Sequence, residues 1–343
     1  MTNIAAVVHE LGGVAQKRQL VKRGARDEEL TRAVRAGEVI RVRQGWYSTL
    51  ASDAPAVRAI RVGGRLTGIS ALIAAGAWVL GSHPLHVAVH RNASRLRNPG
   101  DRTRRLYRGA RAVVVHWVTD DSVDRGSVTT VALLDALVRV VLDEELETAV
   151  AALDWALRTG AIDAPDLRTL VQRLPQYKRS ITDWVDPACD SLPESLTRTR
   201  LQLRGHHVVS QIPVGSRERI DMVVDNLVAI ETDGEQFHLT RFEEDRRKDI
   251  TITIAGYHVL RPSARMIFRD WHRVYLAVES ALAARRAQGE ISDMPPGVRD
   301  RLVLRPPRSR GGRSPAGSEI RIRTRGRSVA DRTVTRAGSP DGS

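Results

Sequence analysis

Residues 219–234 read RIDMVVDNLVAIETDG, and this stretch decides the fold of the C-terminal part of the chain. RIDMVV (219–224) and LVAIETDG (227–234) are rich in aliphatic residues and flank Asp225-Asn226, so they predict two strands of a hairpin. Alternate residues of a strand share a face. Glu231 and Asp233 therefore share a face of the second strand, and the register decides whether Asp221 joins them.

The loop length sets this register. A three-residue loop at 225–227 places Asp221 opposite Glu231, whereas a two-residue loop places it opposite Ile230 and divides the acids. The apolar pattern favours the longer loop, because it then collects the apolar residues of both strands on one face, with a threonine at the end. These residues are Ile220, Met222, Val224, Val228, Ile230 and Thr232.

Three carboxylates on one face repel one another unless a cation lies between them. Oxygen ligands of this kind suit Mg²⁺ or Mn²⁺. Such an ion can polarise a phosphodiester and lower the pKa of a bound water. The spacing alone, however, favours a simpler interpretation, in which the acids are solvated on an exposed sheet face.

The segments around the hairpin complete an α/β pattern. Residues 186–290 predict the order helix, strand, strand, strand, helix, strand, helix. The first helix begins at Ser191-Leu-Pro-Glu194, which matches a capping box. This helix ends before Gly205. HHVVSQIPV (206–214) predicts the strand that follows it.

Several of these residues and motifs together resemble those of a known protein family. Glu194, Gln211, Asp221, ETDGEQFH (231–238), EEDRRKD (243–249) and GYHVLR (256–261) resemble a bacterial family of Vsr-like (very-short-patch-repair-like) endonuclease domains, over roughly residues 188–285. The resemblance implies a restriction-endonuclease-like fold, in which Asp221 and Glu231 hold a Mg²⁺ or Mn²⁺ ion.

The resemblance also assigns or questions the neighbouring residues. Asp233 stands where restriction-type enzymes usually keep a lysine, so the group that handles the proton is open. His238 is the candidate, because imidazole exchanges protons near neutral pH; the alternative is a hydrogen bond to a neighbouring loop. Glu194 matches a first-helix acid near the metal, although its capping box explains it without catalysis.

Gln211 belongs to the same resemblance and is a candidate for contact with the metal site or a phosphate. Asp245 and Asp249 share a helix face by their spacing, with basic residues beside them. Lys248 stands where the family usually has arginine, so Lys248 and Asp245 are candidates for a phosphate-binding or supporting role. The alternative is a solvated helix surface.

Residues 1–50 predict a separate module of three helices, over 4–11, 16–22 and 27–35, and a hairpin at Gln44-Gly45. The run GGVAQKRQLVKRGARDEELTRAVRAGEVIRVRQGWYS resembles the winged-helix domain of AbiEi-like antitoxins from type IV toxin–antitoxin systems. The resemblance implies a third helix in the DNA major groove. Four arginines would contact phosphates: Arg32, Arg35, Arg41 and Arg43.

Three acids at the start of this third helix argue against DNA contact: Asp27, Glu28 and Glu29. They stabilise a helix N-terminus but repel DNA, so the module is equally open to protein contact or packing. Trp46 and Tyr47 are expected in the core.

The two remaining segments show no site chemistry. Residues 51–185 predict a mixed α/β region, with strands at 85–90 and 112–117 and helices at 131–142, 146–158 and 164–173. Residues 291–343 are rich in Arg, Ser, Gly and Pro and predict a disordered basic tail. Residues 301–343 hold eleven arginines against three acids, which is +8 of the chain's net charge of +14.

Composition excludes several classes of protein. The single cysteine, Cys189, excludes an internal disulfide and a cysteine-based zinc site. The chain has neither an apolar run long enough for a membrane helix nor a secretory signal at its start, so we expect a cytoplasmic protein without a membrane partner.

Together these observations predict a multidomain α/β protein that acts as a metal-dependent DNA endonuclease or nicking enzyme. The alternative is a non-catalytic DNA-binding regulator of the antitoxin class, whose partner toxin is unknown. A protein-interaction module is a third hypothesis.

Overall fold

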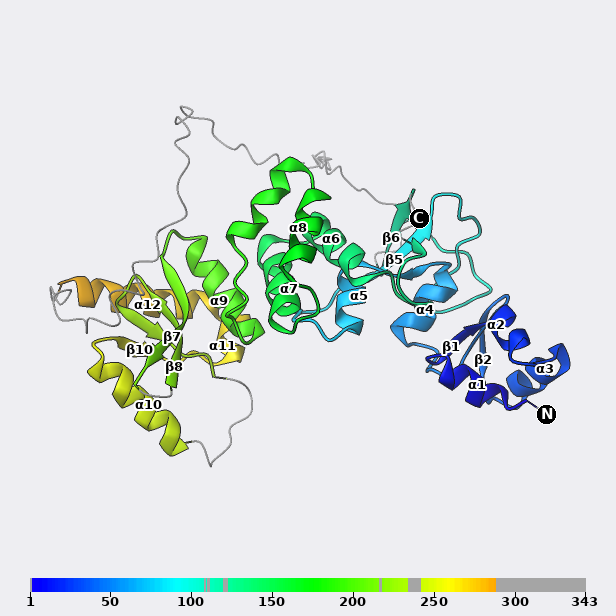
Figure 1. Cartoon of the computed structure of the whole chain (residues 1–343), viewed down its shortest axis with the longest axis horizontal. Helices are drawn as coiled ribbons and strands as arrows, with labels where there is room; N and C mark the ends of the chain where they lie inside the picture. Colours follow the sequence, from blue (N-terminus) through cyan, green and yellow to red (C-terminus); the bar gives the residue numbers. More distant parts are fainter. Residues whose placement is uncertain are drawn as a thin grey trace, which may run out of the picture. The chain divides into compact units, whose positions relative to one another are not determined.

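The computed structural model describes residues 2–107, 109, 112–119, 123–215, 218–233 and 242–287, all within the unit Met1–Leu304. These residues form a mixed α/β structure with three small sheets, which confirms the expected α/β class (Figure 1). Among the described residues, no helix combines the length and the apolar character needed to span a membrane.

Residues 4–48 form three helices and a three-stranded antiparallel sheet. The helices are α1 (Ile4–Glu10), α2 (Lys17–Lys22) and α3 (Asp27–Arg35). The strands are β1 (Val14–Gln16), β2 (Ile40–Arg43) and β3 (Trp46–Ser48), in the order β1-β3-β2. The expected helices and hairpin are confirmed, but β1 was not predicted, because three residues are too few to show an alternating pattern. Tyr47 is in the core, whereas Trp46 is only partly buried.

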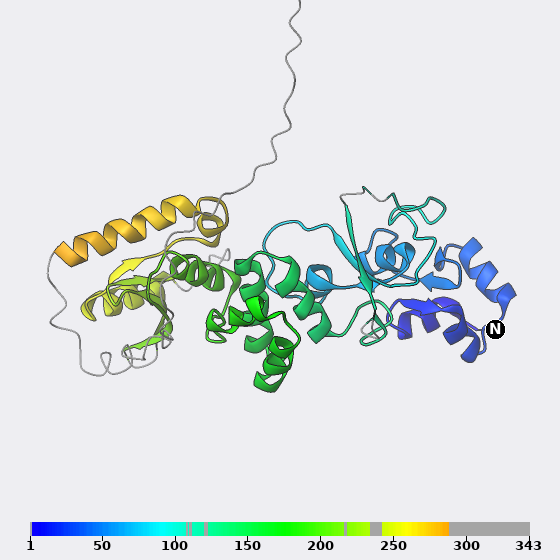
Figure 2. The same ribbon diagram turned by 90° about the horizontal axis from the view of Figure 1, so that it is seen from above.

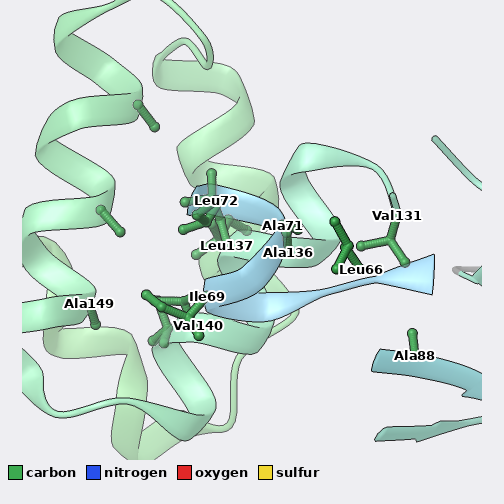
Figure 3. Packing of buried hydrophobic residues seen from close by; sticks show 14 of the residues in the cluster. Leu66, Ile69, Ala71, Leu72, Ala88, Val131, Ala136, Leu137, Val140 and Ala149 are labelled. Carbon is green, nitrogen blue, oxygen red and sulfur yellow. The ribbon is translucent and has the colours of Figure 1, made fainter. Parts of the chain in front are cut away.

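The middle region places a three-stranded sheet beside a group of helices. The helices are α4 (Pro55–Val62), α5 (Gly68–Ala74), α6 (Leu133–Asp143), α7 (Leu146–Arg158), α8 (Ala164–Gln172) and the 3-10 helix η2 (Gln176–Asp183). The strands β4 (Arg65–Leu66), β5 (Leu85–His90) and β6 (Val113–Val118) lie in the order β4-β5-β6. Figure 3 shows α5 and α6 packed through Leu72 and Leu137.

The C-terminal region is a four-stranded sheet with helices on both faces. Its strands β7 (Val208–Val214), β8 (Glu218–Val224), β9 (Val228–Ile230) and β10 (His258–Leu260) lie in the order β10-β9-β8-β7, with β9 and β10 parallel. Its helices are α9 (Leu192–Gln202), α10 (Phe242–Ile254), α11 (Ala264–Arg269) and α12 (Trp271–Ala287). The expected order of elements is confirmed, with α11 as an additional short helix.

Two apolar clusters cover the two faces of this sheet. Val278 and Leu282 of α12 pack with Met222 on one face, and Ile252 of α10 packs with Val223 on the other. Figure 1 shows α10 and α12 on opposite sides of the sheet, and Figure 2 shows the orange helix α12 along its length on one side.

The register of β8 and β9 matches the longer loop. Met222 pairs with Ile230 and Val224 with Val228, which leaves residues 225–227 as the turn. Asp225 and Asn226 adopt left-handed backbone angles, with φ of 48° and 62°, which their short polar side chains tolerate.

The expected apolar face is wrong at one end. Ile220 packs with Ile212 and Val223 rather than with Met222. Opposite this point β7 carries Gln211, whose φ of 55° interrupts the regular pleat. The sequence showed no glycine there to mark such a position.

Candidate active site

The acids predicted from the hairpin lie side by side. The Asp221 N–H donates to Glu231 Oε1 at 3.1 Å, and the Thr232 N–H donates to Asp221 Oδ2 at 2.8 Å. The Thr232 hydroxyl lies 3.1 Å from the same Oδ2. These crossing bonds between neighbouring strands fix both carboxylates, so the expectation that Asp221 joins Glu231 is confirmed.

Lys248 of α10 brings its ammonium group to this pair. Its Nζ contacts Glu231 Oε2 and lies 4.0 Å from Asp221 Oδ1. One oxygen of each carboxylate therefore faces the same cation. The positive charge that three converging acids require is thus supplied, in part, by the protein itself.

Arg261, directly after β10, provides the second cation. Its Nε donates to Asp249 Oδ1 at 2.5 Å and its Nη1 to Asp233 Oδ1 at 3.2 Å. Its Nη2 lies 3.8 Å from Glu231 Oε2. The Asp233 carboxylate therefore contacts Arg261, whereas the carboxylate of Glu231, two residues earlier, contacts Lys248.

Burial raises the pKa of both predicted metal-binding acids. The Glu231 side chain is 5% exposed, and burial with the nearby Asp221 charge raises its pKa to about 7, against the opposing effect of Lys248. Burial also raises the pKa of Asp221, although the Thr232 N–H and Lys248 stabilise its charged form. Carboxyl groups with raised pKa values in one cluster are typical of functional sites.

Glu194 is in the first turn of α9, which Ser191 caps, and lies near this pair. The Glu194 N–H donates to Ser191 Oγ at 3.4 Å, and Asp190 N–H donates to Glu194 Oε2 at 2.9 Å. Gln211 Nε2 donates to the same Oε2 at 3.2 Å. Burial and the charge of Asp221 raise the pKa of Glu194 to about 7. Glu194 and Gln211 thus form a buried polar group beside Asp221.

Asp245 of α10 does not join the pair of acids. The Asp245 side chain is 55% exposed and lies 3.9 Å from Arg261. His238 lies outside the described residues.

The N-terminal arginines divide into two groups. Arg32, Arg35 and Arg41 are exposed. Arg43 is partly buried, and its Nη1 donates to the Ile60 carbonyl of α4 at 3.4 Å. Arg43 therefore binds the protein's own backbone.

Arg261 and Asp249 were not predicted as a connected part of the site. The order of elements contains a usable signal, since the parallel strands β9 and β10 end at the same edge of the sheet. A charged residue directly after β10 therefore lies near one directly after β9, and these residues are Arg261 and Glu231.

The donor set fits a hard divalent cation. Two carboxylates facing one position suffice for Mg²⁺ or Mn²⁺, which keep several waters. Among the described residues, one group of three possible ligands has its atoms within 4.8 Å of one another, and it is the separate cluster His86, His116 and Asp143. Imidazole nitrogen suits zinc, copper or nickel rather than magnesium.

Comparison with known proteins identifies no relative: no protein-family model matches the chain, and no curated protein matches it significantly.

Proposed function

We propose that the C-terminal region is a divalent-metal-dependent endonuclease or nicking enzyme that hydrolyses phosphodiester bonds in DNA. The observation that carries this proposal is the position of Lys248, against Glu231 and 4.0 Å from Asp221. Both carboxylates direct an oxygen at one cationic position, as a shared metal ion requires.

Asp221 and Glu231 would hold Mg²⁺ or Mn²⁺, which when bound supplies Lewis-acid catalysis and lowers the pKa of a coordinated water. Thr232 holds the Asp221 carboxylate in place through its N–H and hydroxyl. Arg261 contacts Asp233 and Asp249. Asp233 would therefore assist by orienting the guanidinium group of Arg261. Lys248 carries the positive charge that can bind a phosphate. His238 remains our proposed proton carrier.

The test is cleavage of supercoiled plasmid DNA by the purified full-length chain, with Mg²⁺ and with EDTA. We expect Asp221→Asn and Glu231→Gln each to lower the Mg²⁺-dependent rate at least about 100-fold, the usual effect of removing a metal-binding or catalytic group. Glu218→Gln is the matched control, because Glu218 is on the same strand, β8, outside the cluster. Cleavage that survives both site substitutions would refute the assignment.

The alternative is a non-catalytic DNA-binding regulator of the antitoxin class. The N-terminal order of helix, strand, helix, helix, strand, strand, with its small antiparallel sheet, supports a winged-helix module there. Arg35 and Arg41 are exposed and are the proposed phosphate contacts. This alternative predicts salt-sensitive duplex binding without strand scission.

A further inference from the structure

The crossover between β5 and β6 lacks, in its described residues, the helix that usually joins parallel strands. These strands are parallel, and parallel strands usually carry helices on both faces. The described residues of the connection contain no helix; they form an irregular hairpin, drawn as coil in Figure 1. In this hairpin Leu106 N–H donates to the Leu96 carbonyl at 2.9 Å and Asn98 N–H to the Arg104 carbonyl at 3.0 Å.

A hollow of about 980 Å³ lies between this hairpin and β6. Its floor is one face of the edge strand, formed by Val113, Val115 and Trp117, which alternate along β6. Residues 93–96 and 105–107 form its walls. The backbone hydrogen bond between Leu106 and Leu96 joins the two walls.

Positive charge is concentrated in this connection. Residues 91–111 contain eight arginines and one aspartate, a net charge of +7. Residues 1–300 carry +6 in total, so all their other residues together carry −1. The single acid, Asp101, accepts hydrogen bonds from the N–H and hydroxyl of Thr103 at 2.8 and 2.6 Å. Arg95 and Arg105 line the hollow and are exposed.

Two aromatic side chains lie open in the same hollow. Tyr107 is 76% exposed and Trp117 is 53% exposed, although large aromatic residues normally bury most of their surface. Arginines combined with exposed aromatic rings are the features that bind unpaired nucleic acid, because phosphates contact the cations and bases stack on the rings. A duplex keeps its bases stacked on each other and so cannot use the rings.

We propose that this hollow binds single-stranded DNA, with Arg95 and Arg105 at phosphates and Trp117 and Tyr107 stacked on bases. The choice of DNA over RNA rests on the proposed function; the preference for single strands rests on the hollow itself.

The test measures binding of fluorescein-labelled dT20 to the full-length chain by fluorescence anisotropy, in EDTA so that no cleavage occurs. We expect Trp117→Ala and Tyr107→Ala each to weaken binding about tenfold, the usual cost of losing one stacked base. Tyr177→Ala is the matched control, because Tyr177 is also 76% exposed and lies elsewhere. Trp117→Phe should restore most of the affinity.

The arginines are tested by salt dependence. The double variant Arg95→Ala, Arg105→Ala should reduce the slope of log affinity against log salt by about 1.4, or about 0.7 for each phosphate contact to a single strand. Arg168 is an exposed arginine of α8 that does not line the hollow, and Arg168→Ala should leave this slope unchanged. Trp117→Ala should not weaken binding to a 20-base-pair duplex as it weakens binding to dT20.

Three results would overturn the proposal. The first is equal affinity of the Trp117→Ala, Tyr107→Ala and Tyr177→Ala variants for dT20. The second is a loss of duplex binding by Trp117→Ala as large as its loss of dT20 binding. The third is tighter binding of rU20 than of dT20 by the wild type. Failure of the nuclease proposal is seen separately, as absent Mg²⁺-dependent cleavage by a chain that still binds dT20 through Trp117.

Discussion

Replacing Glu231 by glutamine should reduce the pH dependence of stability of the C-terminal sheet. Burial raises the pKa of Glu231 from 4.5 to about 7. Between these pH values the folded protein retains a proton that the unfolded chain releases, so the free energy of unfolding falls as pH rises. The stability associated with this proton is fully present below pH 4.5 and is lost above about pH 7.

The size of the effect follows from the two pKa values. Their difference corresponds to about 3 kcal/mol at about 1.4 kcal/mol per tenfold change. Because glutamine stays neutral, Glu231→Gln should be about 3 kcal/mol more stable than the wild type at pH 8 and equal to it at pH 4.5. The nearly complete burial of this side chain, 5% exposed, means that solvent screening reduces the effect little.

The assay is urea unfolding in EDTA from pH 4.5 to 8, followed by hydrogen exchange in peptides from β8 and β9. Glu218→Gln is again the control, and it should keep the pH dependence of the wild type. If Glu231→Gln is the less stable protein at pH 8, Lys248 compensates fully for the buried charge and the reasoning fails.

Three further substitutions test the surrounding structure. Asp154→Ala leaves Arg198, 2% exposed, without its buried partner and should cost about 3–5 kcal/mol in urea unfolding; adding Arg198→Met should recover part of the loss. Gly64→Ala places a Cβ 1.9 Å from the Ala88 carbonyl oxygen. It should lower the free energy of unfolding by about 1–3 kcal/mol, seen as a lower melting temperature. Gly100→Ala should leave the stability nearly unchanged. Arg261→Met removes the hydrogen-bond donor to Asp233 and Asp249 and should reduce amide protection in α10 by about 1–3 kcal/mol.

The local part of the site could be predicted from the sequence. The distance in sequence between Asp221 and Glu231 is short, and the turn between them is fixed by Asp225 and Asn226. Their pairing then follows from the alternation of apolar residues, since a shift of one residue would expose them. The helical spacing of apolar residues likewise predicted the correct bounds of α3 and α7.

The long-range part could not be predicted from periodicity. Lys248 reaches Glu231 from a helix 17 residues away, and its direction depends on how α10 packs on the sheet. Arg261 depends on the parallel pairing of β10 with β9, which a strand pattern does not specify. The hollow beside β6 could not be predicted for another reason: residues 91–111 show no pattern of a regular element, so the sequence does not assign their charge to any one surface.

If the chain binds DNA as we propose, the electrostatics of the acidic cluster require that the affinity come from elsewhere in the chain. Around Lys248 and Arg261 lie five carboxylates, from Asp221, Glu231 and the three aspartates that contact Arg261. Arg246 also contacts Asp249, so with Glu231 protonated four charged carboxylates face three cations. The cluster then keeps a net negative charge, which repels phosphate and which a bound divalent cation would neutralise. A chain that binds DNA with such a site needs separate positive charge. Residues 91–111 carry a net charge of +7, more than the whole net charge of residues 1–300, so on the proposed function this connection, rather than the acidic cluster, would be the main source of phosphate affinity within those residues.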